Sequence, residues 1–401
     1  MKPLPPDHTA PVNIQRRTKR RLWAPVHDLF AVTAPGLEPL CAAELAQLGV
    51  QNIQAQAGGV SFAGKLEDIY RANLWLRTAG RVLLRLADFR VRTWKDLQRQ
   101  AARIPWEVLL APDCRMLVSV SLKNSNLKHS GRVAQEVLAQ AAEHMSALDL
   151  GPPRPATDAC GAARVMLRAG DRRATISIDT SGEHLHKRGY RKAAGPAPLR
   201  EDLAAGLLRL CQYQNGQALL DPMCGAGTLA IEACLMARGL PPGLRRDLAL
   251  TAWPSHRQAM FANLRQRAAA AALSTTSAPV VARDRSAHTL RAAAANAARA
   301  GVEADLAIQK TDFFEASPPE TQPGLVVINP PYGKRLGSLR QAEDFHRRLG
   351  QRLRRAYRGW RVGVVLSRPA WAGLLGLHEI ARRTVPHGGL KVTLLYGRVP
   401  G

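Results

Sequence analysis

From residue 217 onward the chain alternates between short apolar runs and segments with helical spacing, and this alternation limits the possible folds more than any other feature. "QALLDPMCGAGTLAIEACLMA" (217–237) contains an apolar run, a glycine turn and a helical pattern, and "PVVARD" (279–284) starts a second such unit. Further apolar runs follow in "LAIQK", "LVVIN", "RVGVVLS" (361–367) and "LKVTLLYGRV" (390–399). Strands separated by helices form parallel sheets. We therefore expect an α/β domain with a mostly parallel, doubly wound sheet over residues 195–401.

The upstream half has shorter patterns of strand and helix. They predict one small α+β unit over residues 25–90 and a second over 91–182. A basic segment, "HLHKRGYRKAAG" (184–195), leads from these units into the α/β domain, and we expect a connector over 183–194. The proline-rich and basic residues 1–24 are expected to form a disordered arm.

The charge balance points to a polyanionic partner. The chain has 57 Lys and Arg against 31 Asp and Glu, a formal net charge of +26. The six cysteines form no CxxC pair and no Cys/His ligand spacing, which argues against a zinc site and against a disulfide framework. No apolar run reaches the ~18 residues of a membrane span, and the N-terminus has no apolar signal segment. We expect a cytoplasmic protein that needs no metal, binds no membrane and acts as a monomer.

Gly225 and Gly227 in "LLDPMCGAGTLAIEA" follow a predicted strand and open a predicted helix. Such a turn lets a ligand approach the backbone, and the helix start offers free N–H groups. The pattern alone also fits a dinucleotide-binding oxidoreductase. The sharper form "DPMCGAGT" makes Asp221, Cys224, Ala226 and Thr228 candidate ligand contacts together with the glycines.

Two acidic residues follow the next predicted strands. Asp284 ends "VVARD" and is expected to accept hydrogen bonds from ribose hydroxyls, with a helix N-cap as the alternative. Asp312 in "QKTDFF" is expected to accept from an adenine amine while Phe313 packs on the ring, with a cap or a surface loop as the alternative. Both residues would lie where parallel sheets bind ligands, beyond the carboxyl ends of the strands.

"INPPYG" (328–333) interrupts an apolar run with an amide, two prolines and a phenol. Proline fixes φ and removes a backbone donor, and it also restricts the residue before it. The stretch predicts a rigid, kinked exit from a strand that presents Asn329 and Tyr332 in nearly fixed positions. It serves either as a plain turn or as a clamp for a flat ligand.

These motifs together resemble those of class I S-adenosylmethionine-dependent methyltransferases, and the N-P-P-Y form is typical of enzymes that methylate exocyclic or amide nitrogens. The upstream stretches "APGLE", "GGVSF", "YRANLWLRTAGRVLL" and "LHKRGYR…APLRE" resemble the THUMP-domain RNA guanine-N2 methyltransferase family. This resemblance runs from about His27 to the C-terminus. It implies a ferredoxin-like unit over 25–90, a THUMP RNA-binding unit over 91–182 and a Rossmann-like methyltransferase domain over 195–401.

The resemblance also implies roles for individual residues. Residues 224–228 would line the methionine end of S-adenosylmethionine, while Asp284 would hold the ribose and Asp312 the adenine. Asn329, Pro330, Pro331 and Tyr332 would hold the target base. Asn329 would also adjoin the cofactor. RNA in the large ribosomal subunit (23S) is the first expected substrate and the acceptor stem of transfer RNA the second. A catalytically silent RNA-binding assembly factor and an NAD oxidoreductase remain as alternatives from other classes.

The connector contains Lys187, Arg188, Arg191 and Lys192 within six residues. Because it leads from a presumed RNA-binding unit into the catalytic domain, we expect these side chains to contact RNA phosphates, with a solvated linker as the alternative.

Overall fold

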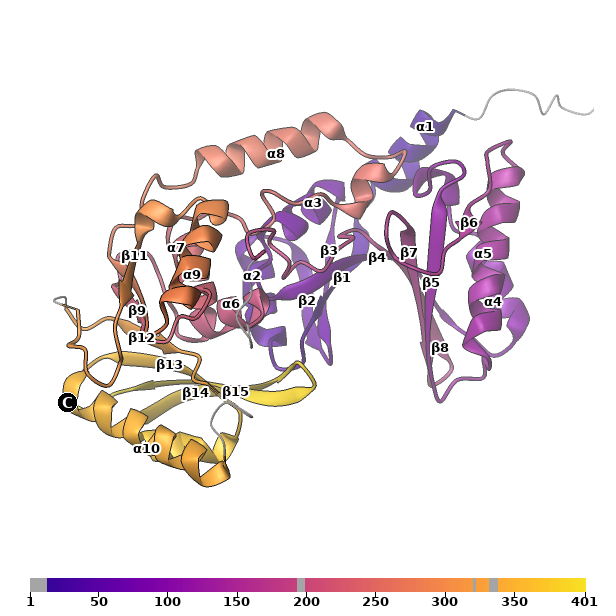
Figure 1. The fold of residues 1–401 in the computed structure, drawn as a ribbon. Helices are drawn as coiled ribbons and strands as arrows, with labels where there is room; N and C mark the ends of the chain where they lie inside the picture. The colour runs from indigo at the N-terminus through magenta and orange to yellow at the C-terminus, as the bar shows by residue number, and fades with distance from the viewer. Residues whose placement is uncertain (1–12, 193–198, 320–321, 332–337) are drawn as a thin grey trace, which may run out of the picture.

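The computed structural model describes residues 13–192, 199–319, 322–331 and 338–401. Its helices and strands form two sheets with their associated helices, one upstream and one downstream of the connector (Figure 1). In Figure 1 the upstream sheet lies on the right and the downstream sheet on the left, and helix α8 stretches along the top between them. The expectation of an α/β domain preceded by an α+β region is confirmed.

The upstream sheet has eight strands in the order β2-β3-β1-β4-β8-β7-β5-β6. Strand β4 is shared, since its first half pairs with β1 and its second half with β8. The predicted boundary between the two upstream units, at residues 90 and 91, therefore lies at the end of β4, and the strands of both units form one continuous sheet. The strands are β1 (His27–Thr33), β2 (Gln51–Gln56), β3 (Gly59–Gly64), β4 (Ala79–Arg90), β5 (Arg115–Lys123), β6 (Arg154–Pro155), β7 (Ala163–Gly170) and β8 (Arg173–Asp179).

The upstream helices pack on this sheet through buried apolar faces. In α5, for example, Val133, Val137, Ala141 and Met145 recur at helical spacing and are all fully buried. The helices are α1 (Ile14–Thr18), α2 (Glu38–Gln47), α3 (Leu66–Trp75), α4 (Trp94–Ala102) and α5 (Ser130–Ser146), with a π-helical turn over Lys19–Trp23 and a 3₁₀ turn over Trp106–Val108.

The prediction of a disordered arm is wrong for residues 13–24. This segment forms α1 and the π-helical turn, and Leu22 at its end is buried in the upstream core. The Trp23 indole donates to the Ser255 carbonyl at 2.9 Å, and Arg17 pairs with Glu107 at 2.5 Å. The dense basic composition hid these few anchoring contacts, each made with a residue far away in the sequence.

The downstream sheet has seven strands in the order β11-β10-β9-β12-β13-β15-β14. The first five are parallel, and β15 pairs antiparallel with both β13 and β14, so the predicted mostly parallel sheet is confirmed. The strands are β9 (Leu219–Asp221), β10 (Val280–Asp284), β11 (Leu306–Lys310), β12 (Leu325–Ile328), β13 (Arg361–Leu366), β14 (His378–His387) and β15 (Leu390–Arg398). Strand β14 was not predicted, because its residues are mostly exposed and its sequence "HEIARRTVPH" lacks an apolar run.

Both faces of this sheet are covered, which explains its continuous apolar strands. In β12, Leu325 and Val327 pack on one side with α6 and α7, whereas Val326 and Ile328 pack on the other side with α10. The helices are α6 (Glu201–Leu210), α7 (Thr228–Ala237), α8 (Gln258–Ala270), α9 (Ala287–Ala300), α10 (Leu339–Ala356) and α11 (Ala372–Leu375), with 3₁₀ turns over Ala249–Ala252, Glu303–Asp305 and Pro369–Trp371. Among the described helices, none is long and apolar enough to cross a membrane.

A buried carboxylate joins the two halves of the molecule. Glu232 on α7 is fully buried and accepts a hydrogen bond from the Tyr190 hydroxyl at 3.1 Å. The Arg188 guanidinium lies 3.6 Å from the same carboxylate, and the Arg77 guanidinium of the upstream half lies 4.0 Å away. Arg77 also donates to the Leu240 carbonyl at 2.6 Å. Burial lowers the pKa of Arg77 to about 10, which leaves it charged at neutral pH.

Gly243 provides a test of this junction. Its N–H donates to the Leu74 carbonyl at 2.9 Å, and a Cβ at this position would lie 2.5 Å from the Asn73 carbonyl. We expect Gly243→Ala to force the two backbones apart and to cost about 1–3 kcal/mol of stability. Thermal unfolding measures the effect. Gly131→Ala on α5 is the control, because no atom lies within 4 Å of its added Cβ. Equal melting temperatures for the two variants would show that the junction is loosely packed.

Candidate active site

The candidate site lies at the carboxyl edge of the downstream sheet. Strands β11, β10, β9 and β12 are neighbours and run parallel, so the residues that follow them meet at one edge. Asp221 ends β9, Asp284 ends β10, Asp312 follows β11 and Asn329 follows β12. The sequence order of the strands reverses between β9 and β12, and open α/β sheets bind ligands at such a point. The structure thus brings together the residues expected to hold the cofactor and the base.

Direct hydrogen bonds link the glycine turn to the next strand. The Cys224 N–H donates to the Arg283 carbonyl at 2.9 Å, and the Gly225 N–H donates to Asp284 Oδ2 at 3.0 Å. Asp284 Oδ1 accepts from the Ser286 N–H at 2.9 Å. The N-cap of α9 is Ser286 and not Asp284, so the alternative of an N-cap role for Asp284 is wrong. A carboxylate oxygen can accept two hydrogen bonds, and each Asp284 oxygen accepts one from these backbone groups, which leaves capacity for ribose hydroxyls.

The two glycines of the turn have different surroundings. Gly225 has φ +53° and no atom within 4 Å of an ideal Cβ, so its Cβ direction is open. Gly227 has φ +84°, and a Cβ there would lie 3.1 Å from the Ala293 side chain. Gly227 therefore allows close packing of the turn against α9, whereas Gly225 leaves space for a ligand. Burial is the main cause that raises the pKa of the neighbouring Cys224 thiol far above neutrality, so this thiol stays protonated.

Asp221 is a buried carboxylate without a hydrogen-bond partner among the described residues. Burial raises its pKa to about 8, and the nearby Asp284 contributes to the shift. The backbone amides of Met223 and Ala230 come close enough to lower the pKa but do not reach hydrogen-bond geometry. A buried carboxyl group without a hydrogen-bond partner lowers stability, and such groups with shifted pKa values are typical of functional sites.

The side-chain oxygen of Asn329 is buried and also has no hydrogen-bond partner in the part of the chain that the structure describes. Pro330 is buried and Pro331 half-buried, and they follow β12 directly. Tyr332 lies outside the described residues. The amide oxygen is therefore an available acceptor on a rigid backbone, as the clamp hypothesis requires.

Asp312 and Phe313 differ in their availability. Asp312 is half-buried and accepts from the Phe314 N–H at 2.8 Å. Phe313 is 3% exposed and stacks on Tyr357, with ring centroids 5.6 Å apart. The prediction that the Phe313 ring packs on adenine is therefore wrong, because this ring belongs to the core on the α10 side of the sheet.

The connector residues also differ from the prediction. Arg188 is 4% exposed and donates to the Arg77 carbonyl at 2.5 Å, so its assignment as a phosphate contact is wrong. Arg191 is half-buried and pairs with Glu201 at 3.1 Å. Lys187 and Lys192 are exposed, although Lys187 lies 3.0 Å from Glu183. The sequence shows the positive charges of the connector but not that Arg188 is buried against Glu232.

The sequence analysis missed Asn296. This residue is fully buried on α9, and its amide nitrogen donates to the Ala226 carbonyl in the glycine turn at 3.0 Å. A single amide in the alanine-rich run "AAAANAARA" (292–300) was the available signal. Asn296 positions the turn from behind. The described residues contain no group of three His, Cys, Asp or Glu side chains arranged to hold a metal.

Comparison with known protein families gives two matches. Residues 188–395 match the RMKL-like methyltransferase domain, and residues 28–83 match the RlmL ferredoxin-like domain. The chain belongs to the RMKL-like methyltransferase family. This membership confirms the Rossmann-like methyltransferase fold and the ferredoxin-like unit, and it excludes the reading as an NAD oxidoreductase.

Similar proteins agree with this assignment. A protein of Synechocystis sp. named "Putative RNA methyltransferase" is 33% identical over 93% of this chain and 97% of its own length. The ribosomal RNA large subunit methyltransferase K/L of Psychromonas ingrahamii is 36% identical over 87% of this chain but only 47% of its own length. The chain spans about half the length of the K/L relatives that it matches.

Solved structures agree as well. The structure of SMU.472, described as "a putative methyltransferase complexed with SAH", superposes with a TM-score of 0.83 at 25% identity over 94% of this chain and 99% of its own. A predicted N6-adenine-specific DNA methylase of Listeria monocytogenes gives the same TM-score at 29% identity, over 94% of this chain and 97% of its own. The cofactor of this methyltransferase domain is S-adenosylmethionine. The unpaired Asp221 carboxylate and the open space at Gly225 fit such a ligand.

The Gly225 space predicts a selective loss of cofactor binding. We expect Gly225→Ala to reduce affinity for S-adenosylhomocysteine at least tenfold, because the added Cβ enters the ligand space. It should also cost about 1–2 kcal/mol of stability through its positive φ. Gly161→Ala is the matched control, with φ +62° and equally open surroundings in the upstream half. Calorimetric titration and thermal unfolding separate the two effects. Equal cofactor affinity in both variants would contradict the assignment.

The Asp221 pKa predicts proton release on cofactor binding. With a pKa of about 8, Asp221 is protonated at pH 7. The cationic amino group of S-adenosylhomocysteine, bound beside it, would favour the ionised form of the carboxyl group. S-adenosylhomocysteine should therefore release up to one proton below pH 8 and none well above it. Titrations in Tris and Hepes, whose ionisation enthalpies differ, measure the release. Asp221→Asn should abolish it; an unchanged release in that variant would show that another group titrates.

Proposed function

We propose that this chain transfers the methyl group of S-adenosylmethionine to the exocyclic N2 of a guanosine in structured RNA. The first candidate substrate is 23S ribosomal RNA, and transfer RNA is the alternative. The observation that carries the proposal is the buried, unpaired oxygen of Asn329 beside the cofactor edge of the sheet. The K/L names of the relatives support a ribosomal substrate.

The chemistry of the guanine amine explains why such a clamp is useful. Its lone pair is delocalised into the ring, so the nitrogen is a poor nucleophile. The bound cofactor supplies a methyl group made electrophilic by a sulfonium. In this proposal the Asn329 oxygen and the Pro330 carbonyl accept hydrogen bonds from the two amine N–H groups, which turns the nitrogen lone pair out of the ring plane. Catalysis is then mainly positioning and electrostatics.

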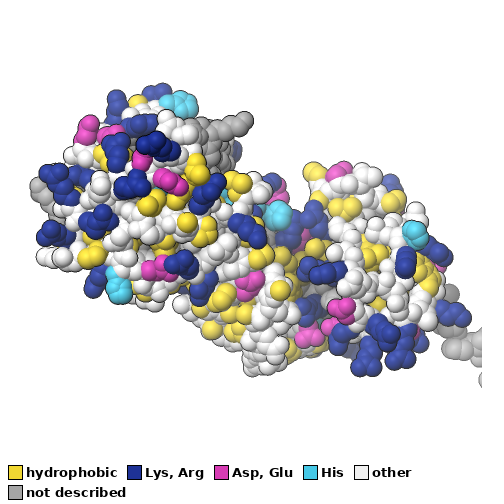
Figure 2. All heavy atoms as spheres, turned by 90° about the horizontal axis from the view of Figure 1, so that it is seen from below, with side chains coloured by type: hydrophobic (Ala, Val, Ile, Leu, Met, Phe, Trp, Pro, Cys, Tyr) yellow, Lys and Arg dark blue, Asp and Glu magenta, His cyan; other side chains and the backbone are white. Residues whose placement is uncertain are grey.

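A base inside a helix cannot reach this edge of the sheet. The target nucleotide is therefore unpaired or flipped out of its stack. The upstream unit over 91–182, proposed as the THUMP unit, would bind the surrounding RNA by shape and phosphate contacts. Figure 2 shows Lys and Arg side chains distributed over both halves of the molecule on the face that it displays, in keeping with the charge of +26.

Asn329 gives the direct test of the clamp. Asn329→Ala should lower single-turnover methyl transfer by about 10²–10³, because one preorganised acceptor is lost at the transition state. RNA affinity should stay nearly unchanged, since phosphate contacts dominate it. Asn329→Asp keeps an acceptor oxygen and should retain more activity than the alanine variant. If Asn329→Ala methylates RNA at nearly the wild-type rate, the clamp hypothesis is wrong and the two prolines form only a turn.

A further inference from the structure

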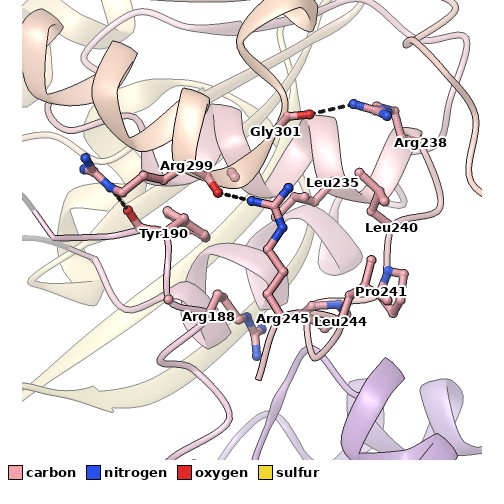
Figure 3. Close-up of a pocket in the computed structure, with 13 residues that line it drawn as sticks. Arg188, Tyr190, Leu235, Arg238, Leu240, Pro241, Leu244, Arg245, Arg299 and Gly301 are labelled. Carbon is pink, nitrogen blue, oxygen red and sulfur yellow. Dashed lines mark hydrogen bonds between the residues drawn. The ribbon is translucent and has the colours of Figure 1, made fainter. Parts of the chain in front are cut away.

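A pocket separate from the candidate active site lies at the C-terminal ends of α7 and α9, away from the glycine turn. Its volume is about 220 Å³, and it is bordered by the last turns of both helices, the loop after α7 and the connector residues 188–190 (Figure 3). Four of the residues that line it are arginines: Arg188, Arg238, Arg245 and Arg299. No lining residue in the described chain is acidic.

The charges around this pocket do not balance. Glu232 behind the pocket pairs with Arg188, and Asp305 pairs with Arg238 at 3.2 Å. Among the described residues, neither Arg245 nor Arg299 has a carboxylate partner. Two helix C-termini contribute only about half a negative charge each, and Arg77 adds a further guanidinium to this cluster. A positive charge therefore remains that an anion would neutralise.

Arg245 is the most available of the four arginines. Figure 3 shows its side chain crossing the pocket toward the Arg299 carbonyl, to which it donates one hydrogen bond. The residue is exposed, and its Nε and second terminal nitrogen have no hydrogen-bond partner among the described residues. These two N–H groups point the same way in a guanidinium, which is the fork that binds a phosphate through two oxygens.

We infer that this pocket binds a backbone phosphate of the RNA substrate, at a distance from the methyl-transfer site. The inference rests on the proposed function, because it is the RNA specificity that selects phosphate as the anion. A basic pocket with free guanidinium donors and a chain of net charge +26 favour a polyanion over a single small metabolite.

The position of the pocket adds a constraint on the substrate. Helix α7 has 10 residues and α9 has 14, and both run from the cofactor edge to the pocket. At 1.5 Å per residue they separate the two sites by about 15–21 Å. An RNA that reaches both sites must pass around the side of the catalytic domain. A folded RNA does this more readily than a short oligonucleotide.

The choice of variant follows from the contacts. Arg299 donates to the Tyr190 carbonyl at 2.7 Å and also to Asn296, which holds the glycine turn. Its replacement would disturb the cofactor site. Among the described residues Arg245 donates no hydrogen bond to Asn296, so Arg245→Ala removes one guanidinium from the pocket and leaves the turn intact. Arg382→Ala on β14 is the charge-matched control, since Arg382 is exposed and pairs only with its neighbour Glu379 among described carboxylates.

The test is the salt dependence of binding to a transcribed domain of 23S RNA. Loss of one phosphate contact should flatten the slope of log K against log salt by roughly 0.7–0.9 in Arg245→Ala. Affinity for S-adenosylhomocysteine should not change, and Arg382→Ala should keep the wild-type slope. An unchanged slope in Arg245→Ala, or an equal flattening in both variants, would overturn the inference.

Inorganic phosphate distinguishes a small-anion site from an RNA site. Titration of the wild-type protein with phosphate alone should show weak binding that Arg245→Ala loses, together with the change in RNA slope. Phosphate binding without any change in RNA slope would contradict the RNA assignment. Methyl transfer to RNA by the wild-type protein is scored separately. If it occurs while the slope is unchanged, the inference fails and the proposed function stands; if no RNA is methylated, the proposed function fails.

Discussion

The buried carboxylate of Glu232 is the interaction on which the arrangement of the molecule depends. It lies on α7, the helix that starts at the glycine turn, and it is held by Arg77, Arg188 and Tyr190 from the upstream half and the connector. Removing one partner of a buried charge cluster is strongly destabilising, because a charge is left without compensation. The same helix therefore follows the cofactor turn at its start and anchors the upstream half through Glu232, one turn further along.

Under the proposed function, this arrangement separates two tasks that RNA methylation requires. Positive charge spread over the surface supplies affinity without selecting a nucleotide. In the proposed function, selection of the base falls to a short rigid edge at the ends of β9, β10 and β12, where unpaired acceptors lie close to backbone N–H groups. Unpaired buried groups such as Asp221 and the Asn329 oxygen lower the stability of the free protein, and strain or cost of this kind is typical of functional sites.

Sequence patterns predicted most of the downstream fold and the location of the site. Alternating apolar runs indicate a parallel sheet, and a parallel sheet collects its strand ends at one edge, so the meeting of Asp221, Asp284 and Asn329 followed from topology, whereas their roles came from the motifs and the family resemblance. Patterns failed where long-range contacts decide. Leu22 orders a segment that its composition marks as disordered, and Glu232 buries Arg188. Phe313 was assigned to the ligand because its ring is next to Asp312 in sequence, but adjacent side chains in a turn diverge, and the ring enters the core.

The identity of the methylated atom tests the central claim most directly. The purified chain is incubated with isotopically labelled S-adenosylmethionine and ribosomal RNA, and the RNA is digested to nucleosides for mass spectrometry. The account predicts label in N2-methylguanosine and none in N6-methyladenosine. Label in N6-methyladenosine alone would show that the edge formed by Asn329 and Pro330 presents adenine, and it would contradict the guanine assignment.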